Sequence, residues 1–497
     1  MELQFERTAL RCLDRIIREV RTEEVTQELK LPEGLPDIGR VLAAWGQVVL
    51  RSKEWRADNV VVSGGVMIWV LYAPEDGSDP RCVDTWLPFS MKWDVSSADR
   101  EGTIRVMPLL RFADSRTLSA RKIMVRAGIG AWGDILCPRE VQICRAGEVP
   151  EDVQLLKRTY PVMLPRESGE KTFVLDEDLT IPGAAAEKLL SYTIQPEITD
   201  RKVAAGKLVF RGSGNLHLVY RCAEGRIRTC DFELPFSQFQ ELEEEHGSDA
   251  RADLAPAVTS LELDLAEEGR LRLKCGLVCQ YVVNDCSLLE LTQDAYSSRR
   301  QMDITMEELK LPAILDEHRE SIRAEQILPG QSGQVVDVTF LPDFPRQRHA
   351  GDSASFEIPG LFQVLYYGDD EALTAASARW EGRYELPAGA DSLIHGISAP
   401  VGRPAAASGS EGMELTGQIQ FLAETTAQQG IPMAAALELG ELQEPDPARP
   451  SLILCRPKGE ELWELAKRCG STVDAIRRAN KLEAEPEDDQ ILLIPVS

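Results

Sequence analysis

Basic side chains are in short supply in this sequence. It has 55 Lys and Arg residues against 81 Asp and Glu residues in a chain of 497, which gives a formal net charge of −26. Proteins that bind nucleic acid or anionic lipid through charge need a local excess of Lys and Arg. The composition therefore argues against both partner classes and favours proteins as partners.

The sequence also lacks a long hydrophobic run and the apolar core of a signal peptide. The longest uncharged stretch, Asn59–Pro74, is too short to span a bilayer, and its many Val residues predict a buried strand. The segment Met1–Val20 is rich in charged side chains. Its apolar residues recur at helical spacing, which predicts an amphipathic helix within a lead-in segment, 1–30. We expect a cytosolic protein.

Motifs for metal binding and catalysis are scarce. The 11 cysteines show no CxxC spacing and the 5 histidines are dispersed, so we expect reduced structural thiols and no metal site. Gly128–Gly133 matches GxGxxG, but Pro138 follows where a dinucleotide site needs a helix. No Ser, Cys or Lys lies in a recognisable nucleophile motif. The sequence predicts no cofactor and no enzymatic activity.

A repeat is the main feature that the sequence does contain. Three similar phrases end in Leu-Pro or Ile-Pro, and an alternating strand that ends in tyrosine follows each of them. Tyr72, Tyr220 and Tyr366, which end these strands, lie 148 and 146 residues apart. The phrases are Leu29–Pro32, Leu179–Pro182 and Leu309–Pro312.

Each tyrosine strand is followed by a polar turn and a second strand that contains Leu-Pro, at Leu87-Pro88, Leu234-Pro235 and Leu386-Pro387. This pattern is typical of a β-hairpin. Further alternating strands flank each hairpin, and no regular helical pattern separates them. The sequence therefore predicts a mainly β protein with three repeated antiparallel modules, each a β-sandwich or barrel-like.

Changes in composition suggest where these modules begin and end. We expect a first module over residues 31–150, a linker and second module over 151–310, a third, divergent module over 311–442 and a Pro-rich linker over 443–450. Val153, Leu155 and Leu156 indicate a short helix between the first two modules. Ser398–Gly412, rich in Pro, Gly and Ala, is typical of a disordered loop.

Residues 451–497 form a different domain, with the pattern strand, helix, helix, strand. Gly459, Leu462-Trp463, Gly470–Val473, Asn480 and Leu493–Pro495 follow the pattern of a LysM domain, which this segment resembles. The resemblance implies a small α+β (βααβ) fold with a glycan groove. The groove residues would be Gly459, Glu460, Glu461, Asn480, Leu482 and Gln490.

The two groove loops depart from the LysM pattern. Glu460-Glu461 replace the usual residue with a short hydroxyl that caps the first helix. Asp488-Asp489 replace the usual Pro-Gly, within a loop of five carboxylates between residues 483 and 489. A neutral glycan approaches such a loop poorly, so we expect glycan binding to be disfavoured.

A protein-binding surface is the use that we predict for this domain instead. It combines one aromatic side chain with a basic strip beside the acidic loop. The residues are Trp463, Lys467, Arg468, Arg477, Arg478 and Lys481. Two alternatives stay open: the strip is a solvated helix face, and Trp463 belongs to the core of the domain.

Three such β modules before a LysM-like segment resemble the SPOCS-domain proteins of endospore-forming bacteria, a family that includes a clostridial spore-coat morphogenetic protein of similar layout. Leu31–Ile38 and Leu234–Phe239 are similar to signatures of this family. The resemblance implies a non-enzymatic scaffold for coat assembly at the forespore surface, in the mother-cell cytoplasm. Its LysM domain would dock on the coat-basement ATPase, stage IV sporulation protein A. Self-association through the β modules is a further possibility.

The alternative function is that of a peptidoglycan- or cortex-binding protein. In that case the LysM domain would hold a glycan that contains N-acetylglucosamine, and the β modules would act as spacers.

Overall fold

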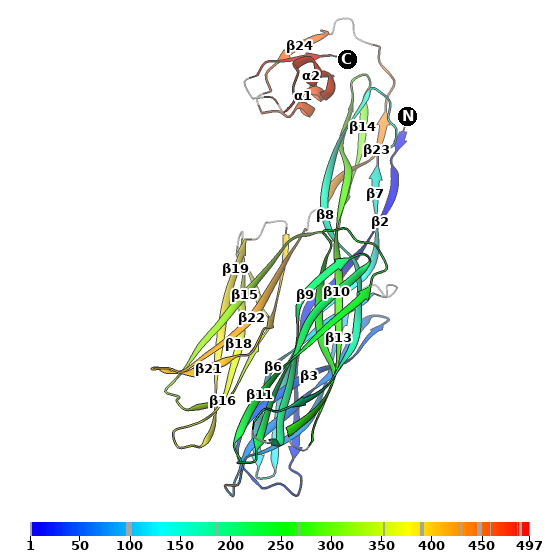
Figure 1. Cartoon of the computed structure of the whole chain (residues 1–497). Coiled ribbons are helices and arrows are strands. Elements are labelled where there is room, and N and C mark those ends of the chain that lie inside the picture. Colours follow the sequence, from blue (N-terminus) through cyan, green and yellow to red (C-terminus); the bar gives the residue numbers. More distant parts are fainter. Residues whose placement is uncertain are drawn as a thin grey trace.

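A computed structural model describes the chain over residues 2–95, 102–183, 186–266, 269–350, 353–387, 392–427, 430–444, 450–457, 459–484, 486 and 490–496. Most of these residues lie in antiparallel strands, and the two helices of the described residues occur close to the C-terminus (Figure 1). The prediction of a mainly β protein is confirmed.

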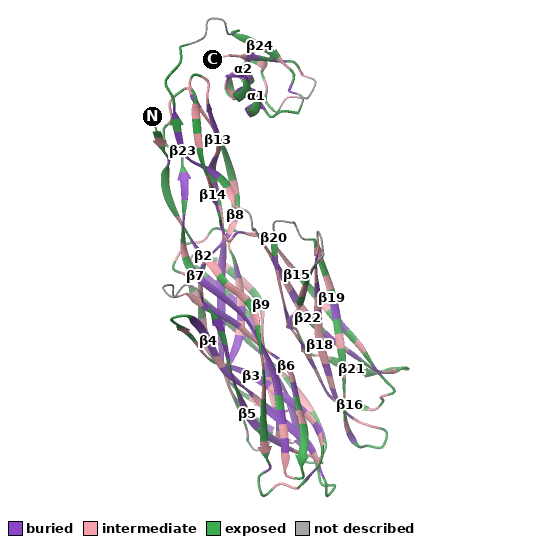
Figure 2. Cartoon of the chain, turned by 180° about the vertical axis from the view of Figure 1, so that it is seen from behind, coloured by how far each residue is buried: buried purple, intermediate pink, exposed green. Residues whose placement is uncertain are grey.

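The first β unit consists of two three-stranded antiparallel sheets that pack face to face. The orders of the strands are β2-β7-β6 and β3-β4-β5. The strands are β2 (Glu6–Lys30), β3 (Ile38–Arg56), β4 (Asn59–Pro74), β5 (Arg81–Asp94), β6 (Thr103–Ser119) and β7 (Lys122–Arg145). Alternate residues, such as Val60 and Val62 of β4 and Ile123 and Val125 of β7, are buried between the sheets (Figure 2).

The second unit repeats this arrangement strand for strand. Its sheets have the orders β12-β13-β8 and β9-β10-β11. The strands are β8 (Val153–Thr180), β9 (Ala186–Ala204), β10 (Lys207–Cys222), β11 (Ile227–Glu241), β12 (Arg251–Leu265) and β13 (Arg270–Ser297). The first and last strands of the unit, β8 and β13, pair along their whole length.

The third unit is built similarly, with β15-β22-β20 against β16-β18-β19, and β15 also pairs with β8 of the second unit at Ile314 and Met163. Two short strands are added: β17 pairs with β18, and β21 pairs with β22. The strands are β15 (Ile314–Pro329), β16 (Gln334–Pro342), β17 (Arg346–Ala350), β18 (Ser353–Tyr367), β19 (Leu373–Pro387), β20 (Ser392–Pro400), β21 (Ala405–Ser408) and β22 (Gly412–Ala427). The segment 398–412, expected to be a disordered loop, thus includes β21.

In each unit, the backbone at the repeated phrase donates a hydrogen bond to the turn between the last two strands of the unit. The backbone N–H of Leu31 donates to the Arg121 carbonyl, and the N–H of Ile181 donates to the Gly269 carbonyl. In the third unit the corresponding strand, β15, ends at Pro329, and the N–H of Gly330 donates to the Glu411 carbonyl.

The spacing of the prolines and tyrosines agrees with this assignment. Pro329 precedes Tyr366 by nearly the same interval that separates Pro32 from Tyr72 and Pro182 from Tyr220. Pro312 lies much further from Tyr366. The third copy of the phrase is therefore the one at Pro329, and Leu309–Pro312 is not its equivalent.

The predicted N-terminal helix is wrong, because residues 6–30 form β2 and pair with β7. A register shift between Arg15 and Ile17 leaves one extra residue, Ile16, in the strand. This bulge changes the phase of the apolar alternation, so that Leu13, Ile16, Ile17 and Val20 recur at helical spacing. The spacing imitates a helix.

The short helix predicted at Val153, Leu155 and Leu156 is wrong as well. These residues begin the 28-residue strand β8 and pair with the end of β13. A register shift between Thr292 and Asp294 of β13 lies opposite this segment. The pattern again reflects an irregular strand whose partner is distant in the sequence.

A stalk extends from the first two units. Its outer sheet has the order β1-β23-β14, from β1 (Glu2–Gln4), β23 (Ile431–Leu439) and β14 (Met302–Leu309). This sheet packs on the adjoining ends of β2, β7, β8 and β13, as Figure 1 shows. The shared core includes Phe5, Ile143, Leu164, Leu291 and Leu437. Segments from the whole length of the chain therefore meet in the stalk.

The C-terminal domain lies beside the tip of the stalk (Figure 1). It contains β24 (Leu452–Cys455), α1 (Leu462–Cys469), α2 (Val473–Asn480) and β25 (Leu492–Pro495), with β24 and β25 antiparallel. Leu465, Ala466, Ile476 and Ile494 are completely buried in its core. The part 445–449 of the predicted Pro-rich linker lies outside the described residues.

The GxGxxG segment lies inside strand β7. A Cβ atom at Gly133 would lie 2.8 Å from the ring of Trp93, and one at Gly128 would come closer still to the ring of Phe112. These glycines are therefore needed because aromatic rings of β5 and β6 rest directly on the backbone of β7.

Candidate functional site: the C-terminal domain and the junction of the β units

The predicted protein-binding residues lie on the two helices of the C-terminal domain. Helix α1 begins after Glu461, whose side chain makes no capping hydrogen bond, as the missing hydroxyl led us to expect. Helix α2 is capped by Thr472, whose Oγ1 accepts from the Ala475 N–H at 3.0 Å. Gly470, with φ of +62°, ends α1 in the left-handed region and allows the sharp turn into α2.

Helix α1 docks on strand β13 of the stalk. The indole Nε1 of Trp463 donates to Asp294 Oδ2 at 2.7 Å, and the Lys467 ammonium lies 2.7 and 2.9 Å from the two carboxylate oxygens of Asp294. The Tyr296 ring meets the Trp463 ring edge-on, with centroids 4.8 Å apart, and its hydroxyl donates to the Ser471 carbonyl at 2.8 Å. Trp463 is 8% exposed.

The pKa of Tyr296 is raised in this contact. Burial, with a smaller contribution from the Asp294 charge, raises the pKa of Tyr296 to about 12. The hydroxyl therefore stays protonated and keeps its hydrogen bond to Ser471 at every physiological pH. Arg158 of β8 adds an exposed ion pair to Glu461 at 3.3 Å.

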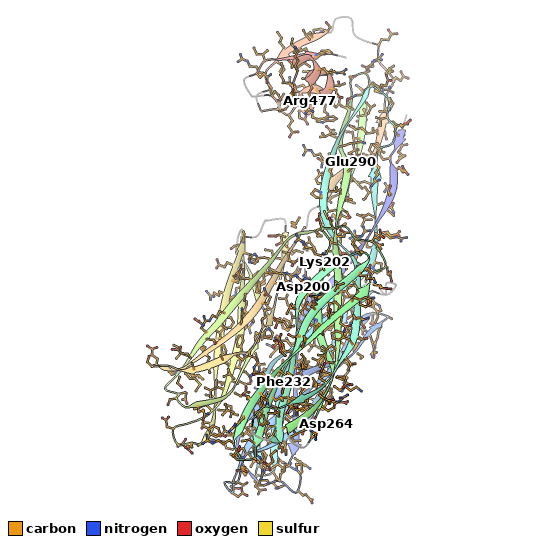
Figure 3. The ribbon with its side chains drawn as sticks, in the orientation of Figure 1. Asp200, Lys202, Phe232, Asp264, Glu290 and Arg477 are labelled. Carbon is orange, nitrogen blue, oxygen red and sulfur yellow. The ribbon has the colours of Figure 1, made fainter. Side chains whose placement is uncertain are left out.

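The other basic residues of the predicted strip are exposed or pair within the domain. Arg468 lies 2.8 Å from Glu460, and this hydrogen bond raises the Arg468 pKa. Arg477, Arg478 and Lys481 are exposed on and just after α2, and Figure 3 labels Arg477. The structure thus divides the strip in two: Trp463 and Lys467 are engaged by the stalk, and the α2 residues are exposed.

The residues predicted for a glycan groove have other roles in this structure. The Asn480 amide donates to the Leu493 carbonyl at 2.6 Å and accepts from the Leu493 N–H at 2.7 Å. These two hydrogen bonds connect the end of α2 to β25. Leu482 packs against the core of the domain, and Glu460 pairs with Arg468. Gly459 is exposed with φ of +83°, and Gln490 is half-buried. Positions 485 and 487–489 of the acidic loop lie outside the described residues.

An exposed apolar face occurs on the two-stranded sheet of the same domain. Leu454 and Leu493 face each other across β24 and β25, and they are 67% and 38% exposed. Leu452 and Ile491 extend this face and are more than half exposed. The sequence analysis missed it, because Leu452–Cys455 is apolar at every position and its pattern does not show which side chains are exposed.

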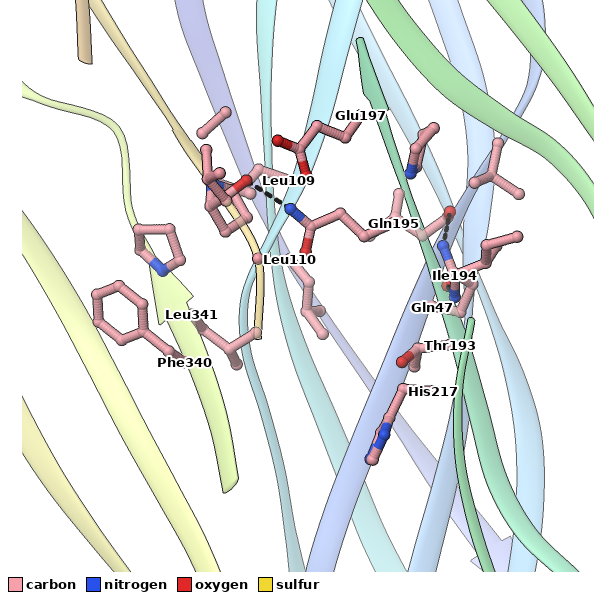
Figure 4. A pocket seen from close by; sticks show the side chains of 18 of the residues that line it. Gln47, Leu109, Leu110, Thr193, Ile194, Gln195, Glu197, His217, Phe340 and Leu341 are labelled. Atoms are coloured by element: carbon pink, nitrogen blue, oxygen red, sulfur yellow. Dashed lines mark hydrogen bonds between the residues drawn. The ribbon is translucent and has the colours of Figure 1, made fainter. Parts of the chain in front are cut away.

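A cavity of about 430 Å³ lies where the three β units meet. Strands β3 and β6 of the first unit, β9 and β12 of the second, and β16, β20 and β22 of the third contribute to its wall. Two glutamines bridge these strands: Gln47 Oε1 accepts from the Ile194 N–H at 2.8 Å, and Gln195 Nε2 donates to the Pro400 carbonyl (Figure 4).

A buried histidine at one end of the cavity connects the three units. His217 of β10 lies 2.7 Å from Asp231 and 3.0 Å from Asp337 of β16, and Trp45 Nε1 of β3 donates to Asp337 at 2.8 Å. Burial lowers the pKa of His217, but the two carboxylates outweigh burial and raise it above its ordinary value. Burial raises the pKa of Asp337, but His217, with smaller contributions from Arg403 and Trp45, outweighs burial and holds that pKa at about 2. Both shifts favour the charged forms of His217 and Asp337.

A second charged cluster joins the three units through their sheets. Arg105 of β6 pairs with Asp134 of β7 at 2.7 Å and with Asp253 of β12 at 2.8 Å. Arg15 and Arg18 of β2 pair with Glu424 of β22 at 2.7 and 2.6 Å. Sequence patterns did not reveal either cluster, because partners such as Arg15 and Glu424 lie 409 residues apart.

No helix among the described residues is long and apolar enough to cross a membrane.

Comparison with known proteins identifies one segment of the chain. The family model described as "SipL, SPOCS domain" matches residues 185–266, which cover β9 to β12 of the second unit. The match includes Leu234–Phe239, one of the two phrases on which the resemblance was based. No curated protein and no solved structure matches the chain. Residues 185–266 are therefore similar to the SPOCS domain of SipL, and this similarity indicates a role connected with sporulation.

Proposed function

We propose that this protein is a non-enzymatic scaffold in endospore coat assembly, that all three β units are copies of the SPOCS domain, and that residues 451–497 form a LysM domain. The SPOCS match in the second unit carries the proposal. The shared order of strands supports its extension to the other two units. The junction clusters support a scaffold role, because they hold the units in one arrangement.

The proposed partner is a coat-basement ATPase of the type of stage IV sporulation protein A, met by the LysM domain at the forespore surface in the mother-cell cytoplasm. The partner would meet the exposed basic residues of α2, because Trp463 and Lys467 of α1 already contact Asp294. Charged residues at an interface steer association and set specificity more than they add affinity. The strongly acidic balance of the rest of the chain favours this basic face as the contact.

A pull-down of purified stage IV sporulation protein A tests the docking. The full chain should retain the ATPase, and a chain without residues 451–497 should not. The charge reversals Arg477→Glu and Arg478→Glu, made together, should weaken binding about tenfold or more. The matched control reverses Lys202 and Arg228, which are exposed on the second unit. Equal retention by the truncated chain would contradict the docking proposal.

Binding of peptidoglycan or cortex is the second candidate, and the LysM-like sequence pattern favours it. The groove positions argue against it, because Asn480 is bonded to the Leu493 backbone and Glu460 to Arg468. Sedimentation of the full chain with purified peptidoglycan at low salt separates the two functions. Co-sedimentation that depends on residues 451–497 would favour the glycan.

A further inference from the structure

The cavity at the junction is enclosed by strands that lie at the ends of their sheets. Within the described part of the chain, β3, β6, β9, β12, β16 and β20 each have a paired strand on one side only. Such edges expose backbone N–H and C=O groups that usually invite another strand. Two kinds of occupant therefore have to be compared for this cavity: an added peptide strand and a smaller molecule.

Proline residues disfavour the addition of a strand, because five of the six edge strands place a proline on the cavity wall. The residues are Pro108, Pro196, Pro256, Pro342 and Pro400. Proline within an edge strand lies where its missing N–H would have pointed away from the neighbouring strand, that is, toward the cavity. Gln47 and Gln195 occupy further edge groups. An added strand would find few donors, so strand addition is disfavoured.

Apolar side chains form part of the cavity wall. Leu109 and Leu110 of β6, Leu254 of β12 and Leu341 of β16 line it, and Figure 4 shows Leu109, Leu110 and Leu341 around one region. The volume of about 430 Å³ falls in the range of about 300–1,000 Å³ that is typical of small-molecule sites. The cavity therefore suits an apolar body.

The His217 end of the cavity carries a cation whose charge is balanced. Arg403 lines the cavity there and lies 3.3 Å from Asp231 and 3.4 Å from Asp337. An anionic ligand at this end would meet the two carboxylates as well as the guanidinium. This end is therefore a poor site for an anion.

The opposite end carries a cation without a direct partner. Arg201 of β9 lines the cavity and has no hydrogen bond or ion pair within the described part of the chain. Burial and the charge of Arg319 both lower the Arg201 pKa, and the charges of Asp253 and Glu317 offset them only in part. An anion beside Arg201 would relieve both effects.

We propose that the junction cavity binds a small amphiphilic carboxylate, with its apolar tail between β6, β12 and β16 and its carboxylate paired with Arg201. The tail would replace water on the leucine and proline wall, and the carboxylate would meet a half-buried guanidinium with no ion-pair partner among the described residues. Because all three units line the cavity, the ligand would also add contacts that hold the units together.

Titration calorimetry of the full chain with decanoate tests this inference. We expect saturable binding of one decanoate per chain, with a Kd below about 1 mM, from burial of its methylenes. Decyltrimethylammonium, which has the same tail and the opposite charge, should bind at least about tenfold more weakly. Absence of saturable binding, or equal binding of the two amphiphiles, would overturn the proposal.

Three variants locate the ligand. Arg201→Gln should weaken decanoate binding about ten- to a hundredfold, because it removes the ionic contact. Lys202→Gln is the matched control: Lys202 is the next residue of β9, is exposed (Figure 3) and should leave binding unchanged. Ala399→Phe should fill the cavity and abolish binding, and thermal unfolding should verify that the variants fold. Unchanged binding by folded Ala399→Phe or by Arg201→Gln would place the ligand elsewhere and refute the assignment.

Discussion

The junction of the three β units and the contact between the stalk and the C-terminal domain are held by similar chemistry at different depths. At the junction, Arg105 of the first unit and Asp253 of the second unit pair at 2.8 Å with side-chain exposures of 1% and 16%. At the stalk, Lys467 and Asp294 pair at 2.7 Å with exposures of 40% and 22%. Water competes for the second pair and hardly reaches the first. The comparison teaches that the units are fixed to one another, whereas the C-terminal domain can separate at moderate cost.

The largest expected effect comes from breaking the junction pair. Arg105→Met removes the closest partner of Asp134 and of Asp253, and it leaves these buried carboxylates only the longer ion pairs to Arg15 and Arg319, at 3.4 and 3.8 Å. Such a loss costs about 3–5 kcal/mol of unfolding free energy. Urea denaturation followed by circular dichroism measures it. Arg272→Met, which removes an exposed arginine paired with Asp176 and Asp178, should cost less than about 1 kcal/mol. A similar cost for both variants would show that depth does not separate the two kinds of contact.

The second effect depends on pH. His217→Gln removes the cation between Asp231 and Asp337 and should cost about 1.5–3 kcal/mol below about pH 6. The pKa of His217 is higher in the folded state than in the unfolded state. Its contribution is therefore complete below the unfolded pKa and is lost as the pH rises through the folded pKa.

The measurement compares wild type and His217→Gln in urea at about pH 6 and about pH 9. Their difference in stability should shrink at the higher pH. The charged groups that face His217 are Asp231, Asp337 and Arg403. Asp337, with a pKa of about 2, stays ionised throughout this range, so it does not confound the result. A difference that grows with pH would contradict the assigned charge pair.

The contact at the stalk should give a smaller, local effect. Asp294→Ala removes the acceptor of both the Trp463 and the Lys467 hydrogen bonds, at a cost of about 1–2 kcal/mol to the contact. Hydrogen exchange should become faster in α1, while urea unfolding of the β units should change by less than about 0.5 kcal/mol. Asp303→Ala, at an exposed position on β14 of the same stalk, is the matched control. Protection of α1 that is unchanged in Asp294→Ala would mean that Asp294 does not hold the domain.

Sequence patterns predicted the parts of this molecule whose partners are local. The hairpins whose first strands end in Tyr72, Tyr220 and Tyr366 could be predicted, because each of these strands pairs with the next strand across a short turn. Strand β2 could not be predicted, because its partner β7 is distant in the sequence. A bulge at Ile16 also gave the apolar residues of β2 helical spacing. A local pattern does not contain information about a distant partner.

The same limit applies to the candidate site. Trp463 was selected from the sequence as a contact residue, but its acceptor Asp294 lies 169 residues earlier. The cavity and its prolines depend on how six edge strands of three units converge. The sequence identified side chains that were suited to contacts, and only the three-dimensional arrangement showed what they meet.

The smallest expected effect concerns the C-terminal domain by itself and sharpens its contrast with the junction. Glu461 precedes α1 in an extended conformation and offers no capping acceptor, whereas Thr472 caps α2. Glu461→Ser should place a hydroxyl beside the free N–H groups of α1 and stabilise the domain by about 0.5–1 kcal/mol. Hydrogen exchange in α1 should slow accordingly, and exchange at the junction should stay the same. Because the exposed ion pair from Glu461 to Arg158 is lost in the same variant, Glu461→Ala serves as the reference. A serine variant no more protected than the alanine variant would show that the missing cap does not limit α1.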